Sequence, residues 1–257
     1  MMDEPPDEKE NVLAKHTRNL LPEVAGGIAG SLVGGPIGGA VGASIGYAAN
    51  EVLGRILARR QVRRIDEVLD AATARIIERR DAGDAFRQDG FFAAADGRSD
   101  AEELAEGVLV TAMSDYEERK TRFYGYLLAN IAFESSIDRG LAHSLVRLAD
   151  RLSYRQLTPL ALVAKKSQFD LPSGNASGRV AWSVWSVKND LDQMGFAQME
   201  LLESEGMPIG SPAGLVLKGE GTLLYDLMEL GRIADSELQE LADRLREAYP
   251  GGSNSVL

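Results

Sequence analysis

The chain has no cysteine and only two histidines, His16 and His143. The lack of cysteine excludes disulfides, thiolate nucleophiles and every zinc or iron–sulfur site that uses sulfur ligands. Two histidines so far apart in sequence also exclude a histidine-rich metal site. Basic residues are scarcer than acidic ones, 28 against 39, and the formal net charge is -11. This charge is opposite to that of proteins that neutralise nucleic-acid phosphates, so nucleic-acid binding is disfavoured.

The sequence also lacks the common catalytic and nucleotide-binding motifs. No two glycines in its glycine-rich run are two positions apart, which excludes GxGxxG there, and no Lys-Ser or Lys-Thr pair follows it as in a P-loop. No GxSxG elbow accompanies either histidine. Adjacent acids such as Glu117 and Glu118 point in different directions on a helix and usually face solvent. We therefore predict no catalytic residue, no metal site, no cofactor and no enzymatic activity.

The most unusual feature present is a run of 26 residues, 24–49, without a charge. Because a helix of roughly 20 apolar residues can span a bilayer, this length favours membrane association. Glycines recur in it at every fourth position and share one helix face, where neighbouring helices can approach closely. The pattern predicts a glycine zipper that packs helices into a homo-oligomer through Gly26, Gly30, Gly34, Gly38, Gly42 and Gly46.

Proline divides this glycine segment. The aliphatic face shifts by one position at Gly34-Gly35-Pro36, which indicates either one kinked helix or a hairpin of two short ones. Seven aliphatic side chains contribute about -2 to -4 kcal/mol to insertion, so insertion is marginal for one copy and is expected to be coupled to association. Two alternatives stay open. The glycine face is buried, either in a soluble hairpin or as the oligomer seam of a scaffold protein, or the run is a flexible linker.

Five arginines follow the glycine segment within ten residues: Arg55, Arg59, Arg60, Arg63 and Arg64. Arginines beside a membrane segment stay on the cytoplasmic side and attract anionic lipid headgroups. They predict contact with the membrane surface. The alternative is a solvated helix face whose arginines pair with Asp66, Glu67 and Asp70 of the same helix.

Beyond the arginines, the periodicity predicts a mainly α-helical body. A long helix is expected from Glu51 to Asp81, followed by a loop and helices at 100–113, 115–134 and 139–152. Ser99 with Glu102 forms a capping-box pattern, and Ser153 is placed to cap the next helix. The apolar residues expected in the core of the second of these helices include Phe123, Tyr126, Leu127, Ile131 and Phe133.

The C-terminal part has the element order of a winged-helix unit. Helices at 154–167 and 179–194 precede two short strands, a turn and two further helices. Acidic residues outnumber basic ones over 154–248, so this unit is expected to be structural or to bind a protein partner rather than DNA. Trp182 and Trp185 are expected in its core or at that interface.

The order of segments gives a predicted domain plan. It comprises an acidic tail and short amphipathic helix at 1–23, the glycine segment at 24–50, a helical region at 51–138, a winged-helix-like domain at 139–250 and a tail at 251–257. The first ten residues are acidic, which is unlike a secretory signal. We expect the protein in the bacterial cytoplasm, at the inner membrane or in both, and not secreted.

Two stretches, EERKTRFYGYLLANIAFES at 117–135 and LVRLADRLSYRQLTPLALVAKK at 145–166, resemble bacterial abortive-infection alpha-type phage-defence proteins. The resemblance covers about a quarter of the chain, and Leu127-Leu128-Ala129-Asn130 is its most particular element. It implies a helical effector of host suicide. Together with the glycine zipper, it predicts a membrane-associated effector that oligomerises and permeabilises the inner membrane. A helical scaffold and a winged-helix regulator are the alternatives.

Overall fold

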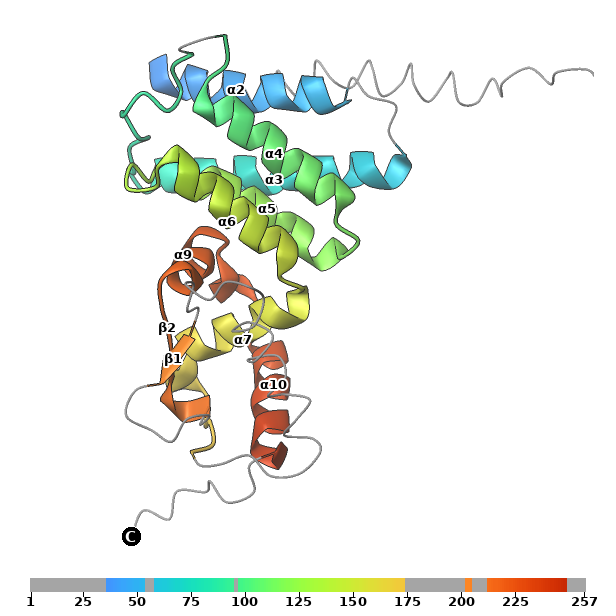
Figure 1. Ribbon diagram of the computed structural model, residues 1–257, viewed down its shortest axis with the longest axis vertical. Helices are drawn as coiled ribbons and strands as arrows, with labels where there is room; N and C mark the ends of the chain where they lie inside the picture. The colour runs from blue at the N-terminus through green and yellow to red at the C-terminus, as the bar shows by residue number, and fades with distance from the viewer. Residues whose placement is uncertain (1–35, 54–57, 95–96, 174–201, 205–211, 249–257) are drawn as a thin grey trace, which may run out of the picture.

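The computed structural model describes residues 36–53, 58–94, 97–173, 202–204 and 212–248. Over these residues the protein is mainly α-helical, as predicted, with eight α-helices and one two-stranded sheet (Figure 1). The helices are α2 (Pro36–Leu53), α3 (Arg59–Asp81), α4 (Asp100–Ser114), α5 (Thr121–Ile131), α6 (Arg139–Arg151), α7 (Tyr154–Ala164), α9 (Glu220–Leu227) and α10 (Asp235–Ala248). The predicted helix at 179–194, with Trp182 and Trp185, lies outside the described residues.

Helix α2 is the second half of the glycine segment. It begins at Pro36, a residue that is well suited to the first turn of a helix because its missing N–H would have no partner there. The predicted start of the next helix at Glu51 is wrong, because α2 continues to Leu53 and α3 begins at Arg59. A local signal marks this start, since the Gln61 side chain accepts a hydrogen bond of 2.9 Å from the Ala58 backbone N–H.

Capping residues fix the starts of three other helices where they were predicted or within one residue. Ser99 Oγ accepts a hydrogen bond from the Glu102 N–H, and the Glu102 carboxylate accepts one from the Ser99 N–H. Asp138 caps α6 by accepting from the Leu141 N–H, and Gln156 accepts from the Ser153 N–H at the start of α7. Each side chain satisfies a backbone donor that the first helical turn leaves free.

Helix α5 starts later than predicted. Residues 115–117 are not helical, and the short 3₁₀ helix η1 (Glu118–Lys120) leads into Thr121. The reason is that the Asp115 carboxylate accepts a hydrogen bond from the Glu117 backbone N–H at 2.9 Å, which favours a turn over a helix. The expected core residues of α5 are buried, except that Tyr126 is only partly buried.

Helices α3 and α5 make the most extensive helix–helix contact among the described residues. A Cβ atom on Gly125 would lie 2.5 Å from the Val68 carbonyl oxygen and 2.7 Å from the Ala71 Cβ, so only glycine fits at this crossing. Helix α4 packs on both, and α2 lies across α4 at one end of the body (Figure 1).

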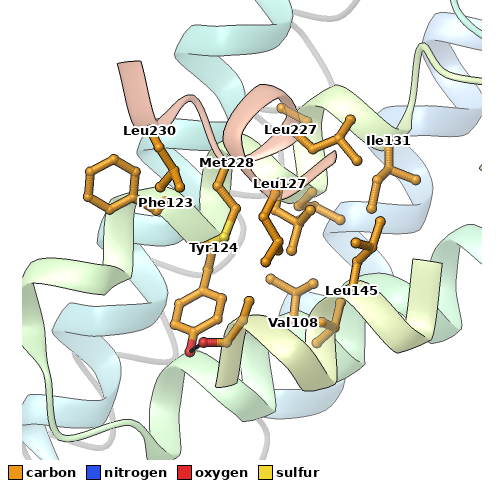
Figure 2. Packing of buried hydrophobic residues seen from close by; sticks show 14 of the residues in the cluster. Val108, Phe123, Tyr124, Leu127, Ile131, Leu145, Leu227, Met228 and Leu230 are labelled. Carbon is orange, nitrogen blue, oxygen red and sulfur yellow. Dashed lines mark hydrogen bonds between the residues drawn. The ribbon is translucent and has the colours of Figure 1, made fainter. Parts of the chain in front are cut away.

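The C-terminal elements join the same hydrophobic core. Strands β1 (Leu202–Ser204) and β2 (Leu215–Leu217) form an antiparallel pair in which Glu203 faces Val216. Figure 2 shows Leu227, Met228 and Leu230 beside the buried side chains of α5. The two strands and the helices after them agree with the predicted element order, whereas the winged-helix assignment stays a prediction because 174–201 lies outside the described residues.

Candidate functional site

The glycine face of α2 is buried within the chain. Gly38, Gly42 and Gly46 are buried, whereas Gly39, Ala43 and Tyr47 lie on the exposed side of the same helix. This division follows the four-residue spacing of the glycines. Gly26, Gly30 and Gly34 lie outside the described residues. The predicted role of the glycines in membrane or oligomer packing stays a prediction.

Helix α4 is the main cover of α2. The buried aliphatic side chains Val41, Ile45 and Val52 belong to the common core, and the only side-chain hydrogen bond found between α2 and the rest of the described chain joins Ser44 Oγ and Ser99 Oγ at 3.4 Å. Ser99 is also the N-cap of α4, so this contact fixes α2 at the start of its covering helix. None of the described helices is both long enough and apolar enough to cross a membrane.

The five candidate membrane-surface arginines have different environments. Arg59 and Arg60 are exposed at the start of α3, and Arg55 lies outside the described residues. Arg63 is also exposed, with Glu118 at 3.4 Å. Arg64 instead points into the protein, where it donates to Glu118 at 2.8 Å and to the Met113 carbonyl at 3.0 Å. The hydrogen bond from Arg64 lowers the pKa of Glu118, and only 11% of the Arg64 side chain is exposed. The predicted contact of these arginines with a membrane surface stays a prediction.

A buried charged cluster closes the loop before α5. Lys120 Nζ lies 2.6 Å from Asp115 Oδ2, and both side chains are more than nine-tenths buried. Tyr124 Oη donates to the same Asp115 oxygen at 2.7 Å, and Lys120 Nζ also donates to the Asp150 carbonyl at 3.2 Å. Burial and the adjacent carboxylate raise the pKa of Tyr124 above its ordinary value, so it remains a neutral donor. Lys120, Asp115 and Tyr124 thus all have partners inside the protein, as is typical of a cluster that stabilises the fold.

A second charged cluster joins α3 to the segment after α9. Four side chains of alternating sign close a ring, here called the Arg–Glu ring: Arg75, Glu78, Arg232 and Glu229. Arg75 lies 3.0 Å from Glu78 and 2.6 Å from Glu229, and Arg232 lies 2.6 Å from Glu78 and 2.9 Å from Glu229. The hydrogen bonds from Arg75 and Arg232 lower the pKa of Glu78, so the ring is charged at neutral pH.

Asn130 of α5 contacts two members of the Arg–Glu ring and is almost fully buried. Its Oδ1 accepts from Arg75 Nε at 3.1 Å, and its Nδ2 donates to the Leu227 carbonyl at 2.9 Å and to Glu229 at 3.3 Å. One amide therefore connects α3, α5 and the end of α9. Because a buried amide without partners is costly, these contacts stabilise this particular arrangement.

The residues weighed for catalysis are not gathered into a site in the described part of the chain. His143 is on α6, with Nε2 3.8 Å from Glu103 Oε1 and without a hydrogen-bond partner. His16 lies outside the described residues. Where side chains are described, no group of three or more His, Asp or Glu residues is placed to hold a metal ion. The expected absence of catalytic and metal-binding residues stays a prediction.

No protein-family model matches the chain, and no curated protein or solved structure matches it either. The resemblance to abortive-infection proteins therefore stays a prediction.

The Arg–Glu ring is not predictable from the sequence. Arg232 and Glu78 are separated by 154 positions, so no local pattern links them. The spacing of Arg75 and Glu78 predicts only a pair within one helix. The one available signal was Asn130 in Leu127-Leu128-Ala129-Asn130, a polar residue in an otherwise apolar stretch of a core helix.

Proposed function

We propose that the protein is a non-enzymatic helical effector that acts at the bacterial inner membrane, with its glycine helix stored against α4 in the resting state. Release of α2 would present the glycine face to other copies and the aliphatic side chains to lipid. The resemblance to abortive-infection proteins supports a setting in phage defence. Membrane lipid and further copies of the chain are the proposed partners, and the C-terminal domain is proposed to bind the protein that controls release.

The observation that carries this proposal is the one-sided attachment of α2. Its glycine face and large aliphatic side chains are covered mainly by α4, and Gly39, Ala43 and Tyr47 are open to solvent. Residues 24–35, which come directly before α2, are also uncharged. Arg59 and Arg60, a few residues after α2, would meet anionic headgroups when α2 enters the lipid. A helix of this composition is stable only while covered, because glycines exposed to water weaken a helix by about 1 kcal/mol each.

A disulfide between α2 and α4 tests the proposal. The chain has no cysteine, and Ser44 and Ser99 have their hydroxyl oxygens 3.4 Å apart. The double variant Ser44→Cys/Ser99→Cys is therefore placed to form a disulfide that holds α2 on its cover. We expect the reduced purified protein to release dye from phosphatidylglycerol-rich vesicles and the oxidised protein to release little.

Each single cysteine variant serves as the control, because it carries the same loss of a serine without the cross-link. Ser99→Cys also removes the N-cap of α4, at a cost of about 1 kcal/mol. Equal dye release by the oxidised and reduced double variant, or none by either, would contradict release of α2. In cells, the proposal further predicts wild-type protein that resists carbonate washing and lowers the membrane potential.

A helical scaffold is the second candidate function, favoured by the burial of Gly38, Gly42 and Gly46 inside a single chain. In that case the glycines serve only close packing of α2. The scaffold predicts a defined oligomer or complex that is extracted without detergent and leaves the membrane potential unchanged. Light scattering of the extracted protein and a potential-sensitive dye distinguish it from the effector.

A further inference from the structure

We infer that Glu229 is a latch that couples the C-terminal helices α9 and α10 to α3, and that removal of its charge lets this part of the chain open separately from the helical body. The inference is independent of the proposed function, because it concerns neither α2 nor a membrane. It rests on the backbone of residue 229, on the position of its carboxylate in the Arg–Glu ring, and on the contacts around it.

The backbone at Glu229 is unusual. Among the described residues it is the only one other than glycine with a positive φ, with φ 54° and ψ 42°. An L-residue with a side chain is disfavoured in this left-handed conformation, which persists only where the surroundings enforce it. Glycine would remove this cost, yet the position holds a glutamate. The side chain therefore has a role that outweighs the strained backbone.

That role is to place one carboxylate between two guanidinium groups. Glu229 Oε1 faces Arg75 of α3, and Glu229 Oε2 faces Arg232 of the short 3₁₀ helix η4 (Leu230–Arg232). Asn130 Nδ2 also donates a hydrogen bond to Glu229 Oε1 at 3.3 Å. The Arg75 and Glu229 side chains are less than one-fifth exposed, so this pair is screened less by solvent than the other pairs of the ring.

Apolar side chains on both sides of Glu229 hold this segment against the core. Leu227, Met228, Leu230 and Ile233 flank Glu229 and are all nearly fully buried against the core. Two other ion pairs tie α10 to earlier helices, Arg119 with Glu237 and Lys165 with Asp235, but each includes a side chain that is more than 60% exposed. Exposed pairs contribute little. Helices α9 and α10 themselves pack on α5, α6 and α7. The Arg–Glu ring is therefore the polar contact that ties the segment between α9 and α10 to α3.

Native-state hydrogen exchange of the full chain tests the latch. In Glu229→Gln we expect the amides of 220–248 to exchange at least about tenfold faster, because hydrogen bonds to a charged group are lost, while those of 59–81 and 121–131 keep their rates. Glu78→Gln removes the other acid of the ring without touching residue 229, and we expect a smaller acceleration because Glu78 is about half exposed. Glu240→Gln removes an exposed acid of α10 that has no contact with the ring, and it should leave the rates unchanged.

The comparison of Glu229→Gly with Glu229→Ala separates the strained backbone from the charge. Both variants lack the carboxylate, but glycine adopts φ 54° without strain, so 220–248 should exchange more slowly in the glycine variant. This pair also keeps the test valid should Glu229→Gln not fold. Rates in Glu229→Gln equal to those in Glu240→Gln would overturn the inference. So would acceleration spread evenly over all helices, or an alanine variant as well protected as the glycine variant.

Discussion

The ammonium group of Lys120 is the clearest case of a charge that the fold has to satisfy internally. It lies 2.6 Å from Asp115 Oδ2 with both side chains buried. We predict that Lys120→Met destabilises the protein by about 3–5 kcal/mol, because it leaves a buried carboxylate without its cation. The double variant Asp115→Asn/Lys120→Met should lose less than the sum of the two single changes, since no charge remains buried. Urea denaturation of the four proteins measures this coupling. Strict additivity would show that the pair is not coupled.

Asp115 also makes stability depend on pH. Burial alone raises the pKa of this carboxyl, but hydrogen bonds from Lys120, the Glu117 N–H and Tyr124 outweigh burial and hold the pKa below its ordinary value of 3.8. A carboxyl with a lowered pKa in the folded state stabilises that state at pH values above the unfolded pKa. The stabilisation is lost as the pH falls below 3.8 through the folded value.

We therefore predict that the free energy of unfolding decreases below about pH 4, and that this decrease is shallower in Asp115→Asn. Urea titrations at a series of pH values compare the two slopes. Glu78, Asp89 and Glu118 also have lowered pKa values, so the variant should keep part of the slope. Identical slopes for the two proteins would contradict the role given to Asp115.

Helix α2 offers a matched pair of glycines on opposite sides. Gly42 is buried and Gly39 is exposed with open space around its missing Cβ. We predict that Gly42→Leu loosens α2 from α4, because a large side chain would have to be inserted on the buried face, at a cost of about 1–3 kcal/mol. Gly39→Leu should be neutral or slightly stabilising, because leucine favours the helix more than glycine. Limited proteolysis within 36–53 measures the difference, and equal protection in both variants would show that the glycine face is not packed.

The helices show which local signals a sequence carries. The pair Ser99 and Glu102 was sufficient to place one helix start, and Ser153 another, since capping involves only a few neighbouring residues. Apolar periodicity placed the core face of α5 but joined helices that are separate, because the periodic pattern of 51–81 continues across the break before Arg59. The close approach at Gly125 was not predicted, since it depends on where Val68 and Ala71 of another helix lie. The helices were therefore predictable individually, whereas their crossings and the Arg–Glu ring were not.

At the scale of the whole molecule, the negative net charge opposes the proposed association with anionic lipid. The net charge of -11 repels anionic lipid over long distances. Screening limits this repulsion to about 8–10 Å at physiological salt, so a local group such as Arg59 and Arg60 still attracts headgroups when it is near the surface. The proposed effector thus depends on α2 reaching the lipid first. In that proposal, the arginines at the start of α3 would then hold α2 in its orientation at the surface.

One hydrophobic core runs through the whole described chain, from Val41 in α2 to Ala248 in α10. It crosses the boundary between 138 and 139 that the sequence predicts between two domains, and Asn130 to Leu227 and Arg119 to Glu237 are polar contacts across the same boundary. We therefore predict a single cooperative thermal transition in which the calorimetric and van't Hoff enthalpies agree. Differential scanning calorimetry of the full chain measures both enthalpies. Two separate transitions in the wild-type protein would instead show that 51–138 and 139–250 fold independently.

The Glu229→Gln variant should broaden or split the transition, because it weakens the polar contact that couples α9 and α10 to α3, whereas Glu240→Gln should leave it single.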